Sequence, residues 1–348
     1  MITYFDKEKL KMKRFIALLL ISVLCLGLAA CGEASAPVEQ TASASQQLTA
    51  GAGGFVAEEP IPEVDVTNSV CFTDSLGREI TVESADRVAV LIGSFTDIWI
   101  LAGGKDRIVA AANDSWTNFD LDLADTVVNT GSVKDPELEV ILGAEPDFVI
   151  ASSNTKADIE LLETFENAGL NVAYFDVENF NDYLNMLDIC TQITGCRDNF
   201  EKYGLEVQKQ VEEAKKMVDG SAPSVLYVRA SGSSVTVKGS EGNLLGEMLD
   251  DLGCVNIADS DTAILENLSL ERIIADDPDF IFAVCQGADP TDAQNLLEST
   301  LLSNPAWNTL TAVKEGRFMT LENQLYNLKP NADWGYAYEK LANILYGK

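Results

Sequence analysis

The chain has 348 residues, of which 47% are hydrophobic and 23% charged, proportions typical of a soluble globular protein with room for two domains. Its 55 acidic side chains outnumber its 24 basic ones, and the resulting formal charge of −31 makes nucleic acid an improbable partner because phosphate backbones are repelled. Histidine is absent, which excludes a Ser-His-Asp triad and a histidine-rich site for free zinc or manganese.

The first segment is typical of a secreted protein. Lys11, Lys13 and Arg14 precede an apolar run, FIALLLISVLCLGLAA, which at about fifteen residues is short for a membrane span. The run ends in Leu28-Ala29-Ala30-Cys31, which resembles the bacterial lipobox, where the cysteine thiol takes a diacylglycerol thioether and becomes the new N-terminus. We expect residues 1–30 to be a lipoprotein signal peptide that starts at Met1 or Met12. An ordinary secretory signal is the alternative.

The next segment has no hydrophobic period. Residues 31–66 are rich in Ala, Ser, Gly and Gln and are predicted to be a flexible tether. A coil of about thirty residues spans ~30 Å, which is enough to hold a domain clear of a membrane surface.

Strands and helices alternate in the rest of the chain, which predicts an α/β fold with two lobes, each built on a mainly parallel sheet flanked by helices. The N-terminal lobe is assigned to 67–197 and the C-terminal lobe to 220–348. The predicted strands are a hairpin at 70–82, then 87–92, 107–111, 126–129, 147–151, 171–175, 223–230, 234–238, 254–258, 279–284 and 317–321. The predicted helices are 97–102, 136–143, 156–168, 242–252, 269–276 and 331–346.

Residues 198–219 are predicted to form one uninterrupted helix that joins the lobes. Apolar residues recur at steps of three and four, and Asp198 with Glu201 has the spacing of a capping box. Such a helix would be ~33 Å long, about the width of a small domain. A continuous helix resists bending, so we expect only a small closure of the lobes on binding.

The two lobes contain a repeated unit. ELEVILGAEPDFVI (137–150) and SLERIIADDPDFIF (269–282) align without a gap, placing Glu139 on Glu271 and Ile141 on Ile273. Each is a short helix that ends before a Pro-Asp pair, followed by a strand buried on both faces. Two such lobes leave a cleft that the carboxyl ends of the strands face, and open α/β sheets bind ligands in such crevices.

At this point the chain resembles the class III substrate-binding proteins of ABC importers, the family that captures ferric siderophores, haem and cobalamin. Besides the repeated unit, the resemblance rests on five segments: Thr73–Arg78, Asn243–Leu245, Leu252–Ile257, Asn304–Trp307 and Ala312–Arg317. It implies an extracytoplasmic, lipid-anchored capture protein, expected to be a monomer, that has no cofactor of its own and is not an enzyme. Its partners would be an ABC permease with its ATPase and a small metal chelate.

The resemblance also implies a role for Glu139 and Glu271, since in this family one surface glutamate on each lobe docks onto arginine pockets of the permease. A carboxylate pair held apart by a rigid body can fix orientation in this way. The alternative is that a glutamate in the first turn only favours the helix dipole.

Residues that follow strand ends are the candidates for ligand contact, and we select Ser94, Phe95, Trp116, Arg229, Tyr326 and Lys329. Arg229 suits a carboxylate or catecholate oxygen, or equally a salt bridge to an acidic neighbour. Without histidine, a chelated metal fits better than a free one, because a chelate brings its own metal ligands. A ferric siderophore is preferred. Haem held by a tyrosinate such as Tyr326, and cobalamin, stay open.

Other classes of function compete. A lipid-anchored surface enzyme is disfavoured because neither G-x-S-x-G nor G-x-G-x-x-G occurs. A ligand sensor for a membrane receptor would use the same fold. No C-x-x-C pair is present, and a disulfide between Cys190 and Cys196 is left open.

Overall fold

The structure is a computed structural model that describes residues 69–260, 265, 269–287 and 289–347. The predicted signal peptide and tether, with Cys31, lie outside these residues. None of the helices in the described part of the chain is long and apolar enough to cross a membrane.

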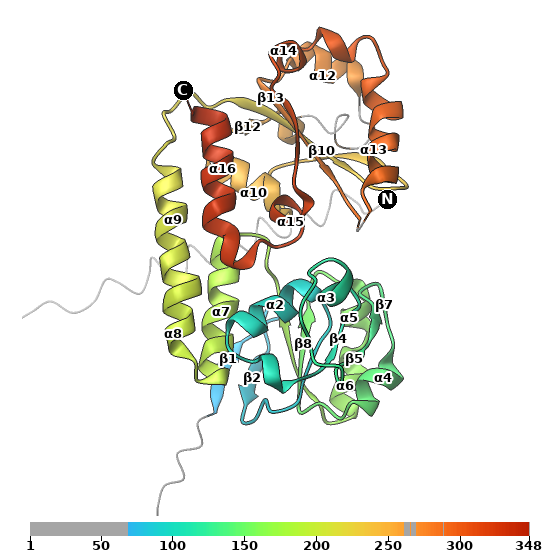
Figure 1. The fold of residues 1–348 in the computed structure, drawn as a ribbon, viewed down its shortest axis with the longest axis vertical. Helices are drawn as coiled ribbons and strands as arrows, with labels where there is room; N and C mark the ends of the chain where they lie inside the picture. The colour runs from blue at the N-terminus through green and yellow to red at the C-terminus, as the bar shows by residue number, and fades with distance from the viewer. Residues whose placement is uncertain (1–68, 261–264, 266–268, 288, 348) are drawn as a thin grey trace, which may run out of the picture. The chain divides into compact units, whose positions relative to one another are not determined.

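The N-terminal lobe is built on a five-stranded sheet in which all neighbouring strands are parallel (Figure 1). Its order is β5 (Val128–Asn129), β4 (Ile108–Ala111), β3 (Val88–Val90), β8 (Phe148–Ser152) and β9 (Asn171–Phe175). The predicted hairpin before it is confirmed as β1 (Val70–Thr73) and β2 (Glu79–Val82), which pair antiparallel. The helices are α2 (Gly93–Leu101), α3 (Asp114–Thr117), α4 (Leu138–Gly143), α5 (Lys156–Glu160) and α6 (Leu162–Asn167), and β6 (Gly131–Ser132) pairs with β7 (Asp135–Pro136).

The C-terminal lobe repeats this plan with one antiparallel edge. Its strands run in the order β11 (Val235–Lys238), β10 (Ser224–Ala230), β13 (Phe280–Cys285) and β14 (Phe318–Leu321), and the short β12 (Val255–Asn256) also pairs with β10. Only β11 is antiparallel to β10, so the sheet is mainly parallel as predicted. The helices are α10 (Leu244–Asp251), α12 (Leu270–Asp276), α13 (Thr291–Leu297), α14 (Thr311–Lys314) and α15 (Asn323–Tyr326).

A group of longer helices lies beside the two sheets: α7 (Phe180–Thr194), α9 (Glu206–Lys215) and α16 (Trp334–Tyr346). Figure 1 shows α7 leading to α8 (Arg197–Phe200), and α9 lying alongside α16. The sequence analysis did not predict α7, although Asn179 and Asp182 form a capping box at its start.

The helix predicted at 198–219 is present but differs in its ends and its continuity. It begins after Cys196 and its last turn ends at Lys215, and residues Glu201–Leu205 form a π-helical segment between α8 and α9. The hydroxyl of Tyr183 on α7 donates to the Tyr203 carbonyl in this segment, 2.9 Å away. A π-helical turn changes the hydrogen-bond pattern from i→i+4 to i→i+5 inside the helix, which the periodicity of apolar residues does not reveal. The capping box at Asp198 was wrong, because Cys196 is the N-cap residue and makes no side-chain cap.

The repeated unit folds the same way in both lobes. Ile141 on α4 and Ile273 on α12 are fully buried. The carboxylate of Asp147 accepts from the Arg87 backbone N–H at 3.0 Å, and that of Asp279 accepts from the Ser224 N–H at 2.8 Å. The Pro-Asp pair of each lobe therefore fastens the start of the neighbouring strand, β3 or β10.

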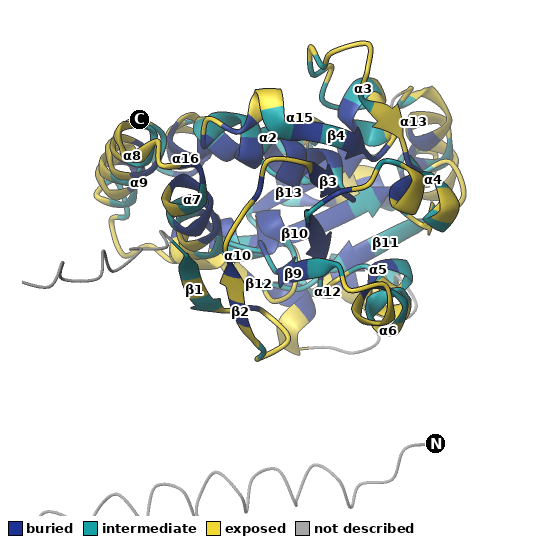
Figure 2. Cartoon of the chain, turned by 90° about the horizontal axis from the view of Figure 1, so that it is seen from below, coloured by how far each residue is buried: buried dark blue, intermediate teal, exposed yellow. Residues whose placement is uncertain are grey.

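Alternate residues of each buried strand pack into different cores, as a parallel sheet covered on both faces requires. In β8, Phe148 and Ile150 belong to a large core shared with α2, α7, α9 and α16, whereas Val149 and Ala151 pack against α4 and α6. The C-terminal sheet packs its second face against α12 and α13. Figure 2 shows the resulting pattern, with mostly buried strands and exposed outer faces on the helices.

Candidate functional site

A cavity of about 320 Å³ lies where the carboxyl ends of strands from both lobes meet. The N-terminal lobe contributes Asn154, which follows β8, and Glu178, which follows β9. The C-terminal lobe contributes side chains from β10, from the start of α10, and from the end of α15 with the segment after it: Tyr227, Arg229, Asn243, Leu244, Tyr326, Asn327 and Lys329. This is the interlobe cleft that the sequence analysis expected.

Two cations lie together on the C-terminal side of the cavity. Arg229 faces Thr236 across the antiparallel β10–β11 pair, and Lys238 faces Tyr227, so all four side chains lie on one face of the sheet. Burial lowers the pKa of Lys238, and the nearby Arg229 guanidinium lowers it further. Two like charges held side by side are stabilised when an anion binds between them.

A third cation approaches from the segment after α15. Lys329 is partly buried, and burial lowers the pKa of its ammonium, an effect opposed by the carboxylates of Asp176, Glu178, Asp114 and Asp182. None of these acids lies within 4.0 Å of the ammonium in an ion pair among the described residues, so the interaction acts across the cleft at longer range. Lys329 thus links the C-terminal lobe electrostatically to the acidic edge of the N-terminal lobe.

Beneath this acidic edge lies a buried carboxyl group. Asp158 is fully buried; its Oδ2 accepts from the Ser152 backbone N–H at 2.8 Å, and its Oδ1 has no hydrogen-bond partner among the described residues. Burial and, to a smaller extent, the nearby Asp114 carboxylate raise the pKa of Asp158 to about 7, although the hydrogen bond from Ser152 opposes the shift. Asp114 in turn accepts from the Gly93 N–H at 2.9 Å, and burial raises its pKa as well. Asp158 therefore holds the end of β8 through Ser152 without lining the cavity itself.

The structure brings together three of the six predicted ligand contacts: Arg229, Tyr326 and Lys329 line the cavity. The other three do not line it. Ser94 and Phe95 are buried in α2, where the Phe95 ring packs edge-on against Phe175, and Trp116 packs partly buried against the shared core. Residues just after a strand can enter a helix and turn into the core, which position along the chain does not reveal.

The cavity also contains residues that the sequence analysis did not select. Glu178 is the charged one, and Asn243 and Asn327 add amides. Lys238, which was not selected either, does not line the cavity but lies on the same face of the sheet as Arg229. Lys238 could have been found by pairing the two predicted strands at 223–230 and 234–238, because that register places it opposite Tyr227.

Tyr326 is fully buried, and its hydroxyl donates to the Ala337 carbonyl at 3.0 Å. Burial raises the pKa of this phenol well above its ordinary value. A raised pKa disfavours the phenolate that would ligate haem iron. The geometry therefore gives Tyr326 the role of a wall and a hydrogen-bond donor to its own lobe.

The two predicted docking glutamates occupy equivalent positions. Glu139 lies exposed in the first turn of α4, and Glu271 lies exposed in the first turn of α12. Neither forms an ion pair within 4.0 Å among the described residues.

Cys190 and Cys196, for which a disulfide had been left open, are both free, Cys190 buried and Cys196 exposed. Cys71, Cys254 and Cys285 are free as well.

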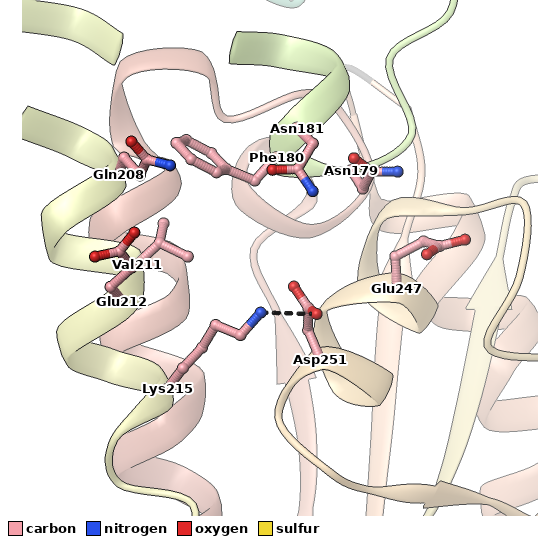
Figure 3. A pocket seen from close by; sticks show the side chains of 9 residues that line it. All are labelled: Asn179, Phe180, Asn181, Gln208, Val211, Glu212, Lys215, Glu247 and Asp251. Carbon is pink, nitrogen blue, oxygen red and sulfur yellow. Dashed lines mark ion pairs between the residues drawn. The ribbon is translucent and has the colours of Figure 1, made fainter. Parts of the chain in front are cut away.

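A separate cavity of about 340 Å³ lies among helices rather than strand ends (Figure 3). The start of α7 contributes Asn179 and Phe180, α9 contributes Lys215, and α10 contributes Asp251. Lys215 and Asp251 form an ion pair of 2.8 Å inside it, and the second oxygen of Asp251 accepts from Tyr338. Glu212 and Glu247 also line it, so carboxylates outnumber the single cation of this cavity.

A sequence profile described as periplasmic binding protein matches residues 88–325, more than half of the chain. The chain belongs to this family of solute-binding proteins. The match covers both lobes and the helices between them, and it confirms the resemblance to class III binding proteins of ABC importers.

Individual proteins that resemble this chain are also solute-binding proteins. The chain is 26% identical over 334 residues to the iron-uptake system-binding protein of Bacillus subtilis, covering 95% of this chain and 96% of that protein. Similar solved structures include the complex of Staphylococcus aureus SirA with staphyloferrin B (TM-score 0.60, 21% identity, 80% of this chain and 97% of that one). The vitamin B12 binding protein BtuF of Vibrio cholerae is also similar (TM-score 0.61, 18% identity, 75% and 96%). At these identities the structures show a shared fold.

Asp158 generates a prediction about stability. Because its folded pKa is raised, the folded protein binds more protons than the unfolded chain between about pH 4 and pH 7, and stability falls as pH rises through this window. Asp158→Asn keeps an acceptor for the Ser152 N–H and removes the titration. Urea unfolding at several pH values should show the slope reduced by up to about 1.4 kcal/mol per pH unit.

The exposed Asp125→Asn is the matched control for this experiment. Equal pH slopes in the parent protein and Asp158→Asn would show that Asp158 does not carry the proton.

Proposed function

We propose that this chain is an extracytoplasmic substrate-binding lipoprotein of an ABC importer that captures an anionic metal chelate, in the first place a ferric siderophore, and delivers it to the permease. The observation that carries the proposal is the group of cations in the interlobe cleft of a protein whose formal charge is −31. Arg229, Lys238 and Lys329 come from three separate segments of the chain and converge on one cavity or its edge.

The proposed mechanism needs only binding and presentation, not a chemical step. The chelate supplies the ligands of its metal, and the protein supplies charge-assisted hydrogen bonds to its outer oxygens. The Arg229 guanidinium can reach two oxygens of a carboxylate or catecholate at once. Lys329 can exchange long-range attraction to Asp176 and Glu178 for contact with the ligand, which favours approach of the lobes. The chain would then act as a monomer without a resident cofactor.

The position of the Tyr326 hydroxyl bears on the choice between a siderophore and haem. Tyr326 donates its hydroxyl inward to Ala337, so it does not favour haem held by a tyrosinate. Ferric citrate, haemin and cyanocobalamin absorb at different wavelengths, and titration of the protein with each of the three shows which one binds.

Removing the cleft cations should weaken binding of an anionic chelate. Arg229→Gln should lower the affinity for ferric citrate by about tenfold or more, because a hydrogen bond to a charged group contributes about 1.5–3 kcal/mol. Lys238→Gln should cause a smaller loss. Equilibrium dialysis with radioactive iron measures both.

Lys156→Gln removes the same charge from an exposed site on α5 and serves as the control. If a protein carrying both Arg229→Gln and Lys238→Gln bound ferric citrate as tightly as the parent, the cleft cations would have no role in capture.

Delivery requires a docking surface, and we assign it to Glu139 and Glu271. Their support is their exposure in equivalent first turns of the repeated unit. Two carboxylates at a fixed separation can select one orientation on a basic partner, which a single contact cannot do.

The double variant Glu139→Ala with Glu271→Ala should retain ferric chelate affinity and lose iron uptake in cells, because the contacts to the permease are removed and the cleft is unchanged. Uptake of radioactive iron and dialysis of the purified protein are measured in parallel. Glu163→Ala with Glu298→Ala removes two exposed glutamates elsewhere and is the control. Normal uptake by the first variant would refute the docking role, and normal iron uptake in cells lacking the protein would favour a sensor.

The anchor is proposed at Cys31, on the strength of the lipobox-like Leu28–Cys31 and the tether that follows. Cys31→Ala should move the protein from the membrane fraction to the soluble extracytoplasmic fraction, since the thiol is the site of the diacylglycerol bond. Immunoblots of the two fractions measure the change. Unaltered membrane association of Cys31→Ala would mean that residues 1–30 are not a lipoprotein signal.

A further inference from the structure

We propose that the cleft contains a second subsite, which holds a neutral, amide-bearing arm of the chelate while its anionic metal centre lies against Arg229. The inference rests on the proposed function and specifies the ligand class: a chelate in two parts, with a charged centre and a polyamide extension. It follows from a second cavity, its lining and the segment that separates it from the first.

The second cavity, of about 400 Å³, also lies between the lobes. Thr117 and Asn118, at the end of α3, line it from the N-terminal lobe. Cys285 at the end of β13, Leu321 at the end of β14 and Gln294 on α13 line it from the C-terminal lobe. Because β13 and β14 end here, the second cavity opens at the same sheet edge as the first.

The lining of this cavity differs in charge from that of the first. Its polar side chains are mainly amides and hydroxyls, and its carboxylate, Glu322, is paired with Lys340. The side chains of Gln294 and Gln324 are exposed and that of Asn118 is half-buried, so all three amides are accessible to a ligand in this cavity. An amide side chain offers both a donor and an acceptor, which matches the paired donor and acceptor of an amide-linked arm.

The two cavities meet at the segment that follows α15. Leu328 lines the second cavity, whereas Asn327 and Lys329 line the first. Asn327 is held in place by a chain of amides: Gln286 at the end of β13 donates to its Oδ1 at 2.9 Å, and its own Nδ2 donates to Asn323 at 2.9 Å. A fixed partition of this kind divides the cleft into a charged and a neutral compartment, and one ligand that occupies both is held at two chemically distinct points.

The test compares two ferric complexes with the same anionic centre, an iron coordinated by three catecholates. Ferric tris-catecholate is compact, whereas the ferric tris complex of 2,3-dihydroxybenzoyl-glycinamide carries on each ring a neutral, amide-bearing arm that does not ligate the iron. Gln294→Trp fills the second cavity from an exposed helix position, and Asn295→Trp places the same side chain on the next residue of α13, which does not line the cavity. Equilibrium dialysis of the full chain with radioactive iron gives both affinities for each variant.

We expect Gln294→Trp to weaken binding of the arm-bearing complex by about tenfold or more while binding of ferric tris-catecholate stays within about twofold, and Asn295→Trp to change neither. Retained binding of ferric tris-catecholate also shows that the variant is folded. An equal loss of both complexes, or no loss of either, would refute the second subsite while leaving the proposed function intact. Failure of the unmodified protein to bind either complex would overturn the proposed function and the inference with it.

Discussion

The two lobes share one hydrophobic core, and the arrangement of the cleft depends on it. At its centre the Trp334 ring lies 5.9 Å from the Phe180 ring and 6.4 Å from the Tyr183 ring, so the start of α16 is packed against α7. The buried Asn331 donates from Nδ2 to the Ser94 carbonyl and the Asp97 carboxylate, which fastens the same segment to α2. The lobes are thus joined by the return of the C-terminal segment as well as by the helix at 197–215, and a large hinge motion would have to break both.

Much of the fold could be predicted from the sequence because the strands and helices show regular hydrophobic periodicity and because one helix–strand unit occurs in both lobes. The strand Asn171–Phe175 was placed to the residue, and the Pro-Asp pairs marked the two equivalent strands β8 and β13. The errors fall where tertiary contacts override local pattern. The π-helical segment at Glu201–Leu205 accepts a hydrogen bond from the Tyr183 hydroxyl on α7. Helix α7 itself was not predicted, although Asn179 and Asp182 have the spacing of a capping box.

The candidate site was predictable only in part, for a geometrical reason. Arg229 stands at the end of a strand whose direction was known, so its place in the cleft followed. Ser94 and Phe95 also follow a strand, but they begin a helix and turn into the core. Lys238 was missed because its position depends on the pairing of two strands, and the carboxylates around Lys329 come from separate turns that only the folded chain brings near it.

The cations in and beside the cleft have the opposite charge to the protein as a whole, whose formal net charge is −31. An acidic exterior attracts bare metal cations, whereas Arg229 in the cavity and the neighbouring Lys238 repel them locally. A negatively charged chelate experiences the reverse: weak repulsion from the acidic exterior and attraction to the Arg229 side of the cleft, which lies opposite the acidic edge of the N-terminal lobe. On the proposed function, this difference in charge makes the protein selective for the charge of the whole chelate and not for the identity of its metal.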